Sequence, residues 1–104
     1  MKFIISSFSW EMFNNFPNIT VDKYELTEDE FQASILDALS HVGHEDIAKA
    51  INVAFNKEPL QVRPGDMLLY ANKARGVLKF YLLVVRECSP MLREEELLIE
   101  EEMI

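Results

Sequence analysis

The sequence predicts one α/β domain, a mixed β-sheet with helices packed mainly on one face. Short apolar runs, rich in β-branched residues or alternating with polar ones, predict strands at residues 2–7, 18–24, 67–70 and 77–85. Apolar residues at helical spacing between these runs predict helices. A chain of 104 residues that is 49% hydrophobic can bury one core, and the order β-α-β-α-α-β-β indicates an α/β sandwich.

The N-terminal part is expected to form a strand, a short helix and a second strand. Residues 2–7 are apolar before a polar stop, which is typical of a buried strand. Ser9 can cap the short helix that follows, and Pro17 ends it. Ile19 and Val21 alternate with polar residues, which predicts a strand with one face in water.

Two helices are expected next. Thr27 and Glu30 form a capping box, in which each side chain can bind the other residue's backbone amide. This helix should run to about residue 39, with Gly43 marking the break. The second helix is expected over residues 45–55, and Pro59 stops any continuation.

A hairpin and an acidic segment complete the chain. A turn at residues 63–66 precedes the core strand at 67–70, and a basic turn at 73–76 leads into the return strand. We expect one domain over residues 1–90 and a separate acidic segment over residues 91–104, which holds six glutamates and one arginine. That segment is compatible with a helix or a frayed tail.

Composition excludes several classes of protein. The formal net charge of −8 argues against binding long DNA or RNA through a broad basic face. The single cysteine, Cys88, excludes an intramolecular disulfide and a Cys-rich zinc site, and it is expected to be a buried apolar residue. No apolar run is long enough for a membrane span or a signal peptide, so a cytoplasmic protein is expected.

The most informative site candidate is His44, which follows Gly43 at an expected helix start. A histidine there can donate a proton beside a phosphate that nearby helix amides hold. The alternative is a capping or exposed turn histidine. His41 lies three residues earlier, a spacing that does not match a two-histidine zinc helix, so no metal site is predicted.

Two further groups of residues are candidate ligand contacts. Ser7 and Ser9 follow the first strand, and ligands gather at the carboxyl ends of strands in α/β sheets. No Gly-x-Ser-x-Gly motif surrounds them, so a serine hydrolase is not indicated. Lys73, Arg75 and Lys79 concentrate positive charge at one hairpin, which could bind phosphate or could be a solvated tip.

These residues support a family comparison. Residues 3–13, Phe16-Pro17 and residues 19–22 resemble the first strand, helix and strand of the viral ring nucleases, small anti-CRISPR proteins of archaeal viruses and phages. Val42-Gly43-His44-Glu45 resembles their hydrophobic-Gly-His-acidic turn, and residues 65–69 resemble their Gly-Asp entry to a core strand. The resemblance covers roughly residues 3–85.

The resemblance implies a homodimer that cleaves cyclic tetra-adenylate, a cyclic oligoadenylate messenger of type III CRISPR defence, without metal or cofactor. By this resemblance His44 is the catalytic acid, Ser9 a ligand contact and Arg75 the phosphate-binding arginine. Ser7, Gly43 and Lys73, which lie close to these residues in the chain, are further expected substrate contacts. A viral protein of this kind acts in the host cytoplasm.

The chain also departs from the family pattern. The family usually has an acidic residue shortly after the arginine, whereas Gly76-Val77-Leu78 follow Arg75 here. Two other interpretations therefore stay open. One is a non-catalytic dimeric module that binds a nucleotide or a host protein, and the other is a protein inhibitor that acts through the acidic residues 91–104.

Overall fold

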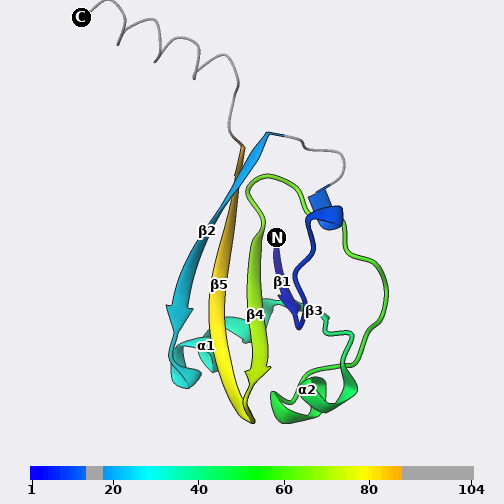
Figure 1. Ribbon diagram of the computed structural model, residues 1–104, viewed down its shortest axis with the longest axis vertical. Coiled ribbons are helices and arrows are strands. Elements are labelled where there is room, and N and C mark those ends of the chain that lie inside the picture. Colours follow the sequence, from blue (N-terminus) through cyan, green and yellow to red (C-terminus); the bar gives the residue numbers. More distant parts are fainter. Residues whose placement is uncertain (14–17, 88–104) are drawn as a thin grey trace, which may run out of the picture.

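A five-stranded mixed sheet in the order β2-β5-β4-β1-β3 organises the protein (Figure 1). The computed structural model describes residues 1–13 and 18–87, so Cys88 and the acidic segment 91–104 lie outside the described part. The strands are β1 (Lys2–Ile5), β2 (Ile19–Leu26), β3 (Leu39–His41), β4 (Met67–Ala74) and β5 (Val77–Glu87). The helices are η1 (Trp10–Phe13), α1 (Glu28–Ser34), η2 (Ile35–Asp37) and α2 (Glu45–Ala50).

The sheet has a parallel half and an antiparallel half. β1 pairs in parallel with both β3 and β4, while β5 pairs antiparallel with β4 and β2. Ile5 stands opposite His41 on one side and opposite Tyr70 on the other. The carboxyl ends of β1, β3 and β4 therefore meet at one edge of the sheet, which we call the carboxyl edge.

The two α-helices pack on one face of the sheet, as the sequence predicts. Their buried residues share a core cluster with strand residues: Ile4, Phe31, Val42, Ile47, Ala48, Ile51, Leu69, Ala71 and Phe80. The capping box at the start of α1 is confirmed, because Thr27 Oγ1 accepts from the Glu30 amide and Glu30 accepts from the Thr27 amide. These hydrogen bonds from Thr27 lower the pKa of the Glu30 carboxyl below its ordinary value.

The opposite face has a second core cluster and a thinner cover. It consists of Phe3, Ile5, Phe13, Val62, Leu68, Leu83 and Val85. η1 and the loop around Leu60 and Val62 cover part of this face, and a hydrogen bond from the Val62 amide to the Met12 carbonyl ties them together. Within residues 1–13 and 18–87, no helix covers the rest of this face, over β2 and β5 (Figure 1).

The β4–β5 hairpin closes with a two-residue turn. Arg75 and Gly76 both have positive φ, at 53° and 79°, which is the signature of a type I′ turn. This turn matches the right-handed twist of the strands, so the hairpin stays tight and ends at the carboxyl edge beside α2 (Figure 1).

The sequence-based helix boundaries between residues 28 and 55 are wrong in two places. The first α-helix ends at Ser34 and continues only as the 3-10 helix η2 to Asp37, and residues 39–41 form β3, because pairing with β1 outweighs local helix preference. The second helix, α2, ends at Ala50 rather than near residue 55. Just after its end, Asn52 takes a left-handed φ of 58° and the Val53 amide donates to the Ala48 carbonyl, which terminates the helix. The Gly43 turn therefore joins a strand to a helix.

Candidate functional site

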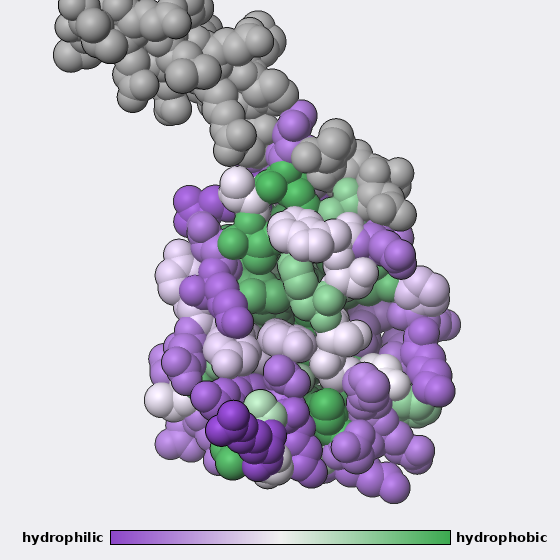
Figure 2. Space-filling model, in the orientation of Figure 1, coloured by the Kyte–Doolittle hydropathy of each residue, from purple (hydrophilic) through white to green (hydrophobic). Residues whose placement is uncertain are grey.

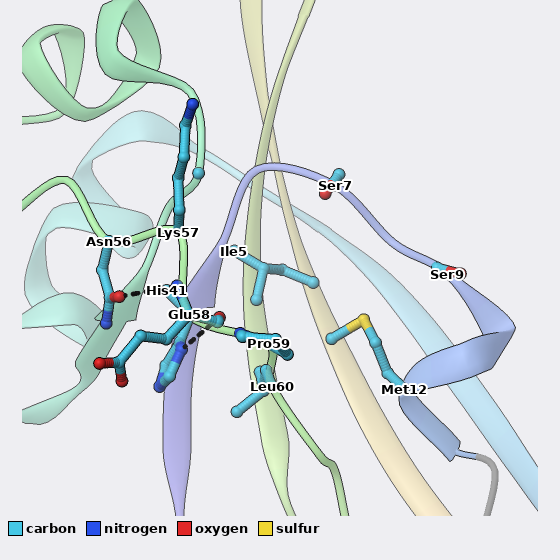
Figure 3. A pocket seen from close by; sticks show the side chains of 11 residues that line it. Ile5, Ser7, Ser9, Met12, His41, Asn56, Lys57, Glu58, Pro59 and Leu60 are labelled. Carbon is cyan, nitrogen blue, oxygen red and sulfur yellow. Dashed lines mark hydrogen bonds between the residues drawn. The ribbon is translucent and has the colours of Figure 1, made fainter.

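A cavity of about 340 Å³ opens at the carboxyl edge, beside the ends of β1 and β3 (Figure 3). We call it the edge cavity. It is lined by Ile5, Ser7, Ser9, Met12, His41, Gly43, Asn56, Lys57, Glu58, Pro59 and Leu60. Three residues predicted as ligand contacts, Ser7, Ser9 and Gly43, thus come together here, although Ser9 and Gly43 are 34 positions apart in the chain.

The serines lie on one side of the edge cavity, in the loop between β1 and η1 (Figure 3). Ser9 caps η1 as expected, since its hydroxyl accepts from the Glu11 amide at 3.3 Å. Ser7 is exposed, so its hydroxyl is free to turn toward a ligand. Because β1 ends at Ile5, these hydroxyls stand beyond the last paired residue of the strand.

The opposite wall is the segment 54–58, which the sequence did not single out. It runs alongside β3, with a parallel bridge between Val42 and Phe55. The Asn56 amide donates to the Val42 carbonyl at 2.9 Å, and the Asn56 side chain donates to the Ser40 carbonyl at 3.0 Å. These bonds extend the sheet at its edge and hold the wall in place.

His41 belongs to this wall. Its Nδ1 lies 3.4 Å from the Glu58 carbonyl oxygen, and its ring packs edge-on against Phe3 at 5.6 Å between centroids. A carbonyl only accepts, so Nδ1 carries the proton in this contact. In Figure 3 the imidazole ring points away from Ser7. Its contacts with Glu58 and Phe3 indicate that His41 supports the wall.

Gly43 is not required by the backbone. Its φ lies outside the left-handed region, and a Cβ added there would meet only the Asn56 carbonyl oxygen, at 3.9 Å. The fold could therefore carry alanine at this position. What glycine provides instead is open space at the cavity wall, where a ligand can approach the main chain closely.

His44 is the residue immediately after the cavity wall. It occupies the N-cap of α2 with extended φ and ψ, its side chain is exposed, and it makes no capping hydrogen bond. The expected helix start is confirmed, while the imidazole does not line the edge cavity itself. His44 directly follows Gly43 in the chain, and its imidazole makes no hydrogen bond to the α2 backbone.

Lys73 and Arg75 lie at the tip of the β4–β5 hairpin. Both are exposed, and neither lines the edge cavity. β4 continues four residues past Tyr70, the partner of Ile5, so the tip projects beyond the end of β1. The hairpin thus adds positive charge to the carboxyl edge, because its strand β4 pairs with β1, whose end lies beside the cavity.

The sequence missed Asn56 and Lys57 because no motif marks them. They follow α2 in a stretch that local rules describe only as a break before Pro59. Their place at the cavity depends on α2 ending early and on the bridge between Phe55 and Val42, which are contacts across the fold. A polar Asn-Lys-Glu run just before a proline was the one available signal.

A second hollow of about 450 Å³ lies on the uncovered sheet face. It is lined by Phe8, Trp10, Val21, Lys23, Tyr70 and Leu83, and we call it the aromatic groove. Trp10 is 65% exposed, and Tyr70 stacks on Tyr81, over which the Lys23 ammonium sits at 4.2 Å. Figure 2 shows hydrophobic and neutral residues running along the middle of this face, with hydrophilic ones around them.

Two searches for other kinds of site concern the described residues alone. Within residues 1–13 and 18–87, no three histidine, cysteine or acidic side chains gather in a way that could hold a metal ion. In the same ranges, no helix has the length and apolar character needed to cross a bilayer.

Comparison with solved structures shows the fold. The chain is similar to B116 of Sulfolobus turreted icosahedral virus, with a TM-score of 0.66 and 18% sequence identity. The match covers 80% of this chain and 97% of that small virus protein. No protein-family model matches the sequence. No curated protein matches it either. The five-stranded α/β architecture is therefore one that a small archaeal virus protein also uses.

Proposed function

We propose that this protein is a metal-independent ring nuclease, of viral origin, that cleaves a cyclic oligoadenylate, namely cyclic tetra-adenylate. The observation that carries the proposal is the meeting of Ser7, Ser9 and Gly43 around one cavity, with His44 on the adjoining turn. The resemblance to viral ring nucleases noted in the sequence rests on the same turn, and the structural likeness to a Sulfolobus virus protein is in keeping with it.

The chemistry needs no metal ion. The 2′-hydroxyl of one nucleotide attacks the adjacent phosphorus, its proton passes to solvent, and the bond from phosphorus to the 5′-oxygen breaks. His44, as imidazolium, gives a proton to that leaving 5′-oxygen. The products carry a 2′,3′-cyclic phosphate, and two such cuts turn cyclic tetra-adenylate into two di-adenylates.

The remaining residues position the ring and balance its charge. Ser7 and Ser9 offer hydroxyl donors on one side of the edge cavity, and Gly43 leaves room for a sugar-phosphate on the other. Lys73 and Arg75 add positive charge at the same edge. Holding the 2′-oxygen in line with the breaking bond supplies most of the remaining acceleration.

A homodimer is part of this proposal. The aromatic groove offers an apolar centre with Lys23 and Glu25 on the same face of β2, so a two-fold copy can meet apolar surface and opposite charge. The loop containing Ser7, Phe8 and Ser9 separates the groove from the edge cavity. Two copies joined at the groove would carry their cavities near the two-fold axis, as a symmetric ring requires.

The test is cleavage of labelled cyclic tetra-adenylate, followed by chromatography. His44→Ala should lower the rate by about 10²–10⁴-fold, the usual contribution of general acid catalysis. Because the His44 side chain is exposed and makes no capping hydrogen bond, the unfolding free energy of His44→Ala should lie within about 0.5 kcal/mol of the wild-type value.

The other histidine is the matched control. His41→Asn keeps a donor near the Glu58 carbonyl and should retain cleavage within about tenfold of wild type. Loss of cleavage in His41→Asn with normal activity in His44→Ala would contradict the assignment.

A second candidate function is a non-catalytic dimeric module that sequesters a nucleotide. It is favoured by the absence of a carboxylate in Gly76-Val77-Leu78 and by the tight two-residue hairpin turn at Arg75. Calorimetry that shows ring binding by wild-type protein, together with intact ring after long incubation, would establish this function instead.

A further inference from the structure

We propose that Lys57 is the cation that binds a phosphate group in the edge cavity. This inference rests on the proposed function, and it assigns to Lys57 a role that the sequence placed at Lys73 and Arg75. Among the described residues that line the edge cavity, Lys57 is the one lysine or arginine.

Ion pairing leaves Lys57 available for a ligand, as it does Lys23, Arg63, Lys73, Arg75 and Lys79 in the described part, so the place of Lys57 at the cavity is what distinguishes it. Three other basic side chains in the described part already have acidic partners: Lys2 with Asp37 at 2.8 Å, Arg86 with Asp22 at 2.9 Å and Lys49 with Glu45 at 3.9 Å. Within residues 1–13 and 18–87, no carboxylate lies within 4.0 Å of the Lys57 ammonium. The Lys57 ammonium therefore has no ion-pair partner among the described residues.

The segment carrying Lys57 is held on both sides. Asn56 before it bonds to Val42 and Ser40, and Glu58 after it donates its amide to Asn56 Oδ1 at 2.9 Å and offers its carbonyl to His41. The backbone of Lys57 is thus positioned by its neighbours, while its long side chain stays free to reach a ligand. Its ammonium lies 5.6 Å from the Phe55 ring, at the outer limit of a cation–π contact.

The opposite side of the cavity supplies complementary donors. Figure 3 shows Lys57 on one side and Ser7 and Ser9 on the other, with the cavity between them. A phosphate oxygen accepts from hydroxyl and ammonium groups alike, so a phosphodiester between these walls would contact both. The Gly43 wall beside Lys57 leaves the main chain open to the same group.

Binding can be measured apart from turnover. Cyclic tetra-deoxyadenylate lacks the attacking 2′-hydroxyl, so calorimetry with this probe reports affinity alone. Lys57→Gln should bind it about tenfold more weakly than wild type, as expected for the loss of one charge-assisted contact. The affinity ratio should shrink as salt rises, because ions screen the exposed ammonium.

Lys49→Gln is the matched control, because Lys49 is an exposed lysine on α2 that already pairs with Glu45. It should bind like wild type. If Lys57→Gln also binds like wild type, the assignment of Lys57 is wrong while the proposed nuclease stands.

A second probe covers a different outcome. AMP carries one phosphate, and titration followed by NMR should shift the backbone amides of Gly43 and Lys57 if the edge cavity accepts it. Cyclic tetra-deoxyadenylate could fail to bind while AMP still produces these shifts and Lys57→Gln abolishes them. In that case the proposed substrate is wrong, but the assignment of Lys57 as an anion-binding residue stands. Failure of both probes to bind overturns both proposals.

Discussion

The edge cavity and the aromatic groove lie on either side of one short loop, yet they are built in opposite ways. The cavity is walled largely by loop residues outside the core, among them Ser7, Ser9 and Lys57, although the 2%-exposed core residue Ile5 also lines it. The groove has Leu83, a 4%-exposed core residue, at its base, and aromatic rings beside it. Substitutions of the loop side chains at the cavity should therefore cost little stability. A substitution of Leu83 at the base of the groove should cost more, because Leu83 is also part of the core.

This difference separates function from stability along the chain. The side chain of Ser7 is available to contact a ligand, whereas that of Leu83 is fixed by packing between β4 and β2. Trp10 stands between the two cases, since it is large and apolar but mostly exposed. Three substitutions test this contrast.

The largest effect is expected at the base of the groove. Leu83→Ala should lower the unfolding free energy by about 2–5 kcal/mol, because it leaves a void in a packed cluster. Ser7→Ala at the edge cavity should change it by less than about 0.5 kcal/mol. Urea denaturation of both variants gives the comparison, and equal losses would contradict the contrast.

The next effect concerns association. If the proposed dimer forms at the aromatic groove, Trp10→Ala should weaken it at least about 30-fold, as expected when an interface tryptophan of hot-spot type is removed. Sedimentation equilibrium measures this directly. Leu36→Ala removes another exposed apolar side chain, 87% exposed, from η2 on the other side of the sheet, and should leave association unchanged. Equal behaviour of the two variants would place the interface elsewhere.

The smallest effect is expected at Gly43. Gly43→Ala should leave stability unchanged or raise it by less than about 1 kcal/mol, because its φ is ordinary and a methyl group has room. Binding of cyclic tetra-deoxyadenylate should weaken about tenfold, since the methyl occupies the cavity wall.

The control for this glycine is Gly65→Ala. Gly65 has a φ of 93°, so alanine there should cost about 1–2 kcal/mol of stability and leave ring binding intact. Thermal melts and calorimetry on both variants separate the two roles of glycine, and unimpaired ring binding by Gly43→Ala would remove Gly43 from the site.

Much of the fold could be predicted because its signals are local. The Thr27–Glu30 capping box, the basic turn at Arg75-Gly76 and the strand after Gly65-Asp66 all lie where the sequence pattern places them. Each depends on backbone groups within a few residues, so spacing alone suffices. The sequence also placed Ser7, Ser9 and Gly43 shortly after apolar runs, and in the structure each lies within four residues of the end of a strand and lines the edge cavity.

β3 and the wall at Asn56 and Lys57 could not be predicted in this way. Residues 39–41 have helical neighbours and become a strand only because β1 offers them a partner. Lys57 reaches the cavity only because Phe55 bridges to Val42. Both depend on pairing between segments far apart in the chain, which carries no local signature.

The amino-acid sequence by itself determined the α/β class, the turns, the caps and the position of His44 at the start of a helix. These follow from preferences that act within one or two helical turns. Only the tertiary structure decided which polar groups share a cavity, and that Lys57 rather than Arg75 lines it. The physical reason is that a cavity exists between segments, so its lining depends on how strands pair and where a helix ends.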